Sequence, residues 1–187
     1  MRVYKPATLR VLAAALDAGS LTPGPAYAVT EGLRAWVAAS GDGPSRATAS
    51  SSGQAPSVEP RRQDEAEEEL EFVALSEAAR DCLRLLASGG QGAEPPVRVV
   101  VVVDVADAAV AVRDENPGEV DLLQAVPVVK IMAAYVDGDG SLPGVEAAVA
   151  AVSAADRGDQ RAEAIVDAVD ELLWYAAEEL PALVSRG

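Results

Sequence analysis

Valine dominates residues 97–105, where it occupies seven of the nine positions. This β-branched residue loses side-chain freedom in a helix and packs well on a pleated sheet. Successive side chains of a strand point to opposite faces, and here both faces are apolar at the centre. A strand of this kind is normally covered on both sides. We therefore predict that residues 97–105 form the central strand of an α/β-type sheet.

Shorter apolar segments predict further strands. The expected strands are residues 3–4, ended by Pro6, and residues 26–29, 109–112 and 128–136. Residues 172–175, with the sequence Leu-Leu-Trp-Tyr, fit a helix or a strand, because four consecutive apolar residues do not distinguish the two periods. We favour a last strand at the edge of the sheet.

Apolar residues at helical spacing predict helices between these strands. Thr8 is expected to cap a helix over residues 9–18, and Gly19 to end it. A longer helix is expected from Asp64 to about residue 87. The other expected helix caps are Thr30, Ser141 and Asp159, and residues 178–184 form a last helical turn. The whole pattern predicts one domain, residues 1–187, of the α/β or α+β class, with a mixed sheet of about five strands covered by helices.

Residues 41–63 differ in composition from the rest of the chain. Gly, Ser and Pro account for eleven of these 23 residues, and the apolar residues are three alanines and Val58. Such a segment buries too little apolar surface to offset the entropy that it loses on ordering. We predict a disordered insertion within the domain. A partner-binding tail around Arg61 and Arg62 is the alternative.

The formal net charge of −15 limits the choice of partner. Duplex nucleic acid and anionic membranes bind cationic surfaces, so neither is expected, and a protein partner with a basic surface is favoured. The single cysteine, Cys82, cannot form an intrachain disulfide, and its place on the apolar side of the long helix indicates core packing. The sequence has no signal-peptide pattern and no apolar run long enough to span a membrane, so we expect a cytoplasmic protein.

The absence of histidine removes histidine-dependent nucleophile pairs and His-ligated zinc, but carboxylates remain. Asp104 and Asp107 follow the predicted central strand, and Asp137 follows a later one. If these two strands are parallel, their ends meet, and the three carboxylates can hold Mg²⁺ through water molecules. The alternative is that Asp104 and Asp107 simply begin a polar loop. No other cofactor is expected, since no phosphate-binding glycine loop is present.

Trp174 and Tyr175 are two of the seven aromatic residues of the chain. Each combines a large apolar body with a polar tip, which suits a protein interface. The alternative is that both close the core at the edge of the sheet, since tryptophan is usually largely buried. Of the two interpretations we favour burial.

Four motifs resemble those of a known family. They are Met-Arg-Val-Tyr-Lys-Pro-Ala-Thr-Leu at residues 1–9, Ala-Tyr-Ala-Val-Thr at 26–30, Glu-Leu-Glu-Phe at 69–72 and Glu-Leu-Leu-Trp-Tyr at 171–175. Together they resemble a family of small uncharacterised proteins from high-GC, actinobacterial-type bacteria, catalogued as a domain of unknown function. The resemblance covers most of the chain outside residues 41–63. It implies an insertion at that point, because the family connection there is often much shorter, and it implies no activity or catalytic residue.

Two functions from different classes remain. The first is a non-catalytic, small cytoplasmic protein that acts through protein–protein contacts. It follows from the lack of a complete catalytic constellation and from the acidic composition. The second is a Mg²⁺-dependent hydrolase or phosphoryl-transfer enzyme that uses Asp104, Asp107 and Asp137. We favour the first.

Overall fold

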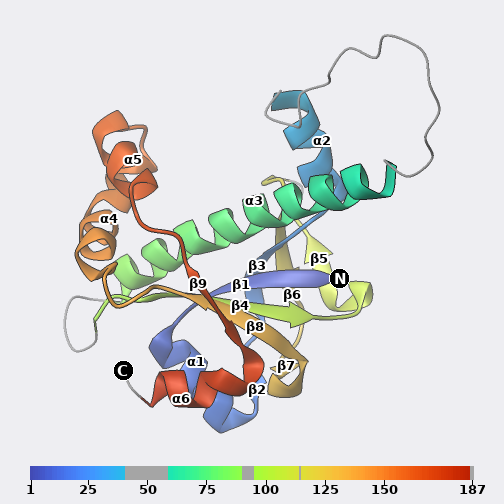
Figure 1. Ribbon diagram of the computed structural model, residues 1–187, viewed down its shortest axis with the longest axis horizontal. Coiled ribbons are helices and arrows are strands. Elements are labelled where there is room, and N and C mark those ends of the chain that lie inside the picture. The colour runs from blue at the N-terminus through green and yellow to red at the C-terminus, as the bar shows by residue number, and fades with distance from the viewer. Residues whose placement is uncertain (41–58, 90–94, 114, 186–187) are drawn as a thin grey trace.

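The computed structural model describes residues 1–40, 59–89, 95–113 and 115–185 (Figure 1). The strands of its main sheet are β1 (Arg2–Thr8), β3 (Gly24–Ala28), β4 (Arg98–Asp104), β5 (Val110–Val112), β6 (Glu119–Leu122), β8 (Ile131–Val136) and β9 (Leu173–Ala176). They lie in the order β5–β6–β3–β1–β4–β8–β9, and every pairing between them is antiparallel. A small second sheet pairs β2 (Ser20–Leu21) with β7 (Val126–Pro127).

Helices pack on both faces of the main sheet (Figure 1). The α-helices are α1 (Leu9–Ala18), α2 (Glu31–Ser40), α3 (Glu59–Ser88), α4 (Leu142–Ala155), α5 (Gln160–Asp167) and α6 (Leu180–Val184), and the 3₁₀ turns are η1 (Asp107–Ala109), η2 (Val128–Lys130) and η3 (Ala177–Glu179). α1 and α6 lie on one face, and α2 and α3 on the other. The predicted α/β fold is confirmed, with seven strands rather than about five and with antiparallel pairing throughout.

The valine-rich strand β4 is an inner strand between β1 and β8, as predicted. Val99, Val101 and Val103 join the core under α1 and α6, which we call the α1-side core. Val100 and Val102 join the α3-side core. A valine-rich strand is expected to be buried on both faces in this way.

Cys82 of α3 also lies in the α3-side core and is fully buried. Its Sγ–H donates to the carbonyl oxygen of Val99 at 3.1 Å. Burial raises the pKa of the thiol to about 12. The interpretation of Cys82 as a core residue is therefore confirmed.

Strand β1 is longer than predicted and includes Pro6, which was expected to end it. Pro6 lies opposite Val100 of β4, whereas β3 pairs with β1 only at Val3 and Tyr4. A proline is tolerated where no neighbouring strand needs its missing N–H. Beyond Tyr4 the β3 side of β1 is such a place, so the strand continues.

The helix ends follow the sequence signals in most places. Thr8 Oγ1 accepts a hydrogen bond from the Val11 N–H, Gly19 adopts a φ of 74°, and Asp159 caps α5 through its side chain. Ser141 begins α4 without a side-chain cap bond, and its hydroxyl donates to Asp170 instead.

The remaining differences concern the start of the long helix, the predicted insertion and one strand that was not predicted. The long helix begins at Glu59 rather than at Asp64, so the last five residues of the predicted insertion at 41–63 are helical. The rest of that insertion lies outside the described residues. Strand β6 was missed because its short sequence, Glu-Val-Asp-Leu, follows a proline–glycine turn and carries two acids.

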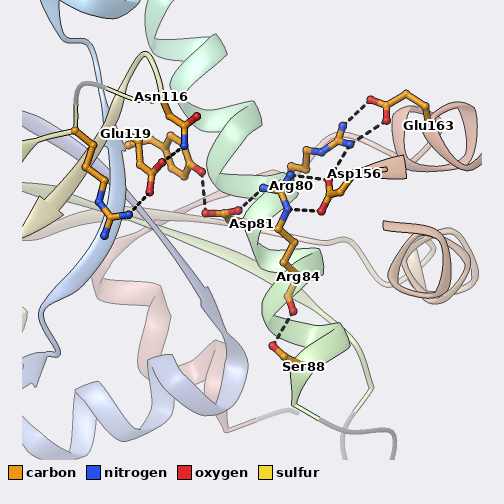
Figure 2. Close-up of polar contacts among 10 residues, drawn as sticks. Arg80, Asp81, Arg84, Ser88, Asn116, Glu119, Asp156 and Glu163 are labelled. Atoms are coloured by element: carbon orange, nitrogen blue, oxygen red, sulfur yellow. Dashed lines mark hydrogen bonds and ion pairs between the residues drawn. The ribbon is translucent and has the colours of Figure 1, made fainter. Parts of the chain in front are cut away.

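An ion-pair network joins α3 to α4 and α5 (Figure 2). Asp156, at the end of α4, accepts hydrogen bonds from Arg84 at 2.7 Å and from Arg80 at 3.2 Å. Arg80 also donates to Glu163 of α5 at 2.6 Å. The network holds the α4–α5 pair beside the C-terminal half of α3 rather than over the sheet (Figure 1). It thereby fixes where the chain enters β9.

We predict that Asp156→Asn lowers stability in a pH-dependent way. The hydrogen bond from Arg84 holds the pKa of Asp156 at about 2, below its ordinary value of 3.8. A lowered pKa in the folded state stabilises above the unfolded pKa, and this contribution disappears as the pH falls from about 4 to about 2. The network is partly solvated, so we expect a loss of about 1 kcal/mol at neutral pH, or a Tm decrease of about 2–4 °C.

Thermal melts between neutral pH and pH 2 test this expectation. The Tm difference between the wild type and Asp156→Asn should be largest at neutral pH and should close in acid. Glu146→Gln, a change at an exposed α4 carboxylate, serves as the control and should follow the wild type. A Tm difference that does not change with pH would contradict the assignment.

Candidate functional site: an acidic cleft beside α3

A cleft of about 710 Å³ lies between α3 and residues 166–172, which lead from α5 into β9. Its floor is the sheet, through Tyr4 of β1, Arg98 of β4 and Tyr135 of β8. The wall from α3 combines apolar and polar side chains, which are Glu68, Glu71, Phe72, Leu75, Ser76, Glu77, Ala79, Arg80 and Leu83. We call this hollow the α3–β9 cleft. Its volume lies in the range of ordinary ligand pockets.

The cleft exists because α3 does not reach across the whole sheet. The helix packs chiefly against β1, β3 and β4. On the same face, Ala133 of β8 still joins the α3-side core, whereas Tyr135 of β8 lines the cleft and Trp174 of β9 is exposed to solvent. Residues 166–172 form the opposite wall, and the Arg80–Glu163 ion pair holds the helix from which they emerge.

The cleft is strongly acidic. Its lining carboxylates are Glu68, Glu71, Glu77, Asp167, Asp170 and Glu171, and its cations are Arg80 and Arg98. Both arginines are engaged by carboxylates outside the lining, Arg80 by Glu163 and Asp156, and Arg98 by Asp137. Among the described side chains, the one cleft carboxylate with an ion pair is Glu71, which contacts Arg2 at 2.6 Å. A cation entering the cleft would therefore meet negative charge that the protein leaves unpaired.

Partial desolvation changes the titration of two side chains in the cleft. It raises the pKa of Glu77, although neighbouring Arg80 and Arg84 oppose the shift. It also raises the pKa of Tyr4, with a further contribution from Glu71. The Tyr4 phenol therefore stays protonated at neutral pH and can donate a hydrogen bond.

A buried ion pair closes one end of the floor. Arg98 Nη2 donates to Asp137 Oδ1 at 2.7 Å, and the Arg98 backbone N–H donates to Asp137 Oδ2 at 2.7 Å. The two side chains are only 7% and 3% exposed. Arg98 Nη2 also donates to the carbonyl oxygen of Asp170 at 2.6 Å, so this pair anchors the second wall of the cleft.

The structure does not bring the three predicted metal ligands together. Strands β4 and β8 are antiparallel, so Asp104 and Asp137 follow opposite ends of the sheet. Asp104 and Asp107 each lie 3.4 Å from the amino group of Met1, whereas Asp137 is occupied by Arg98. Within the described ranges, no group of three or more cysteine, aspartate or glutamate side chains is placed to hold a metal ion.

Trp174 and Tyr175 point to opposite faces of β9, the edge strand predicted at this position. Tyr175 packs against the α1-side core. Trp174 lies opposite Tyr135 of the cleft floor and is 59% exposed. Burial, the interpretation we favoured for both, is therefore wrong for Trp174. The reason is that the helix on this face of the sheet covers inner strands and not β9.

Phe72 is the aromatic residue of this site that sequence reasoning missed. It lines the cleft from α3 and is 57% exposed. The available signal was one phenylalanine in the acidic first half of the long helix. The cleft itself combines four distant parts of the chain, α3, β4, β8 and residues 166–172, with the start of β1. Only the strand order shows that they meet.

No helix in the described part of the chain is both long and apolar enough to cross a membrane.

The fold and the cleft define an antiparallel, helix-covered α/β protein with an acidic hollow beside its edge strand. The chain belongs to the family described as "Family of unknown function (DUF6912)", whose model matches residues 1–59 and 43–184. The predicted membership of a domain of unknown function is thus confirmed. Comparisons with curated proteins and with solved structures gave no match.

We predict that Asp137→Ala destabilises the protein by about 3–5 kcal/mol, because it leaves Arg98 buried without a counter-charge. Urea unfolding measures the change. Asp104→Ala is the matched control, since Asp104 is a 65% exposed carboxylate beside the amino terminus, and it should cost at most about 1 kcal/mol. Equal losses in the two variants would show that the Arg98–Asp137 pair is solvated rather than buried.

Proposed function

We propose that the protein is non-catalytic and acts through protein–protein contacts, with the α3–β9 cleft and its borders as the contact surface. One observation carries the proposal. Two large aromatic side chains, Phe72 and Trp174, are more than half exposed beside an acidic cleft whose arginines are already paired.

The composition of this surface supports a protein partner. Protein interfaces combine a centre rich in aromatic side chains with a polar rim. Here Phe72, Tyr135 and Leu172 supply apolar surface to a lining that also holds six carboxylates, and Trp174 lies opposite Tyr135 at the border of the cleft. Exposure of a large tryptophan side chain to water is unfavourable in free energy, and a partner that covers the side chain removes this cost.

The enzymatic alternative requires three carboxylates at one place, and they lie apart. A Mg²⁺-dependent hydrolase would require Asp104, Asp107 and Asp137 at one end of the sheet. Asp137 follows the opposite end and accepts hydrogen bonds from Arg98 through both of its oxygens. No observation favours it over binding.

We further propose a bacterial cytoplasm as the setting. Cys82 is a single, fully buried cysteine, so no disulfide supports an oxidising compartment. The motif resemblance to proteins of high-GC bacteria supports the bacterial source. A net charge of −15 supports a basic protein partner over nucleic acid or an anionic membrane.

Affinity capture with paired variants tests the proposed function. We expect the wild type to retain a partner that Phe72→Ser/Trp174→Ser loses by at least about tenfold, because both exposed anchors are removed. The control is Leu123→Ser/Val129→Ser, which removes two apolar side chains that are 58% and 84% exposed outside the cleft. This control should retain the partner.

Two outcomes would contradict the proposal. Equal retention by both double variants would show that the cleft is not the contact surface. No specific partner at any salt concentration would remove the protein–protein function itself.

A further inference from the structure

We infer that the partner presents an extended segment rich in lysine or arginine, which adds to β9 as a further strand of the sheet. The inference rests on the proposed function and specifies the class of partner. It combines three features of β9: an unpaired backbone edge, exposed apolar side chains and an excess of nearby carboxylates.

The backbone of β9 is paired on one side only. Among the described strands, β8 is its one neighbour. Such an edge presents N–H and C=O groups that an incoming strand can pair with.

The hydrogen-bond alternation identifies which groups point outward. The N–H of Asp137, the residue just after β8, donates to the carbonyl oxygen of Arg98, so the backbone groups of residue 137 face β4. Alternation then directs Val136 and Ala134 toward their β9 partners, Leu173 and Tyr175. The N–H and C=O of Trp174 must therefore point away from the sheet.

The next outward amide along β9 is already used, because the Ala176 N–H donates to Glu179 Oε2 at 2.9 Å. This bond supports the same alternation independently. It also ends the free edge, so an added strand would pair at Trp174 and toward the cleft rather than toward α6.

The side chains of β9 suit an added strand. Leu173 and Trp174 are 51% and 59% exposed, and they lie on opposite faces of the sheet. Alternate residues of an incoming strand would cover both of them. Edge strands that must stay unpaired are kept short or carry lysine, proline or a bulge. β9 is short, at four residues, and Leu-Trp-Tyr-Ala has none of the other devices.

The edge could pair with a second copy of the chain or with a basic segment of another protein, and charge favours the basic segment. Asp170 and Glu171 precede β9, Glu178 and Glu179 follow it, and no lysine or arginine occurs from residue 168 to residue 179. A second copy of the chain would bring these carboxylates against the same carboxylates of its partner, and each chain has a formal net charge of −15. A basic segment would place its cations beside them and beside the acidic cleft.

Synthetic peptides test the inference directly. The probe is a fluorescent peptide of about eight residues that alternates lysine with valine, and anisotropy at about 50 mM salt gives its Kd. One control alternates glutamate with valine, and the other keeps the lysines but has N-methylated backbone amides. We expect the unmodified basic peptide to bind at least about tenfold tighter than either control, and to slow hydrogen exchange at the Trp174 amide about tenfold.

Matched protein variants separate charge from strand pairing. Glu171→Lys, beside β9, should weaken the basic peptide by about fivefold, whereas Glu146→Lys on α4 should leave its affinity unchanged. Each is an exposed site, so both variants should fold.

Three results would overturn the inference. They are equal binding of the methylated peptide, unchanged exchange at Trp174, or a dimer by sedimentation that Trp174→Ser dissolves. The first two do not bear on the capture experiment with Phe72 and Trp174, so the inference can fail while the proposed function stands. The third would assign the β9 edge to a second copy of the chain. Loss of partner capture together with intact peptide binding would be the converse case.

Discussion

The width of the sheet is the constraint on which the rest of the structure depends. An α-helix with its side chains is about 10 Å across and strands are about 4.8 Å apart, so one helix covers about two or three strands. The long helix α3 lies over β3, β1 and β4. Beyond β4 the sheet continues with β8, of which Ala133 still joins the α3-side core, and with β9, which α3 does not cover. The α3–β9 cleft is the space that remains.

The arginines of the protein explain why this space is acidic. Arg80 and Arg84 form ion pairs that join α3 to α4 and α5 (Figure 2). Arg98 pairs with Asp137 at the floor of the sheet. On the other side of α3, the Tyr27 hydroxyl donates to Asp81 at 2.8 Å and ties the helix to β3. Because these arginines are already paired, little positive charge remains to compensate the carboxylates that line the cleft.

Local signals predicted much of the fold. The valine run identified β4, Thr8 and Gly19 bounded α1, and the apolar segment after α5 formed the edge strand that was expected. Pairing partners were not predictable in the same way. Pro6 stays in β1 because of where β3 ends, and this depends on strands far apart in the chain.

The candidate site depended almost entirely on such long-range pairing. The metal hypothesis needed parallel strands, and antiparallel pairing of β4 with β8 sends Asp104 and Asp137 to opposite ends. The exposure of Trp174 likewise follows from the reach of α3, which local sequence does not encode. Sequence alone could therefore identify candidate residues but not the cleft that brings Phe72 and Tyr135 together.

The central claim is that the face left uncovered by α3 is where the protein meets its partner. Mapping of backbone amide chemical shifts on the ¹⁵N-labelled protein, during titration with its captured partner, tests this most directly. We predict that the changes concentrate in residues 68–83 and 166–176. Changes confined to the α4–α5 pair or to the β5–β6 edge, with the cleft residues unmoved, would contradict the account.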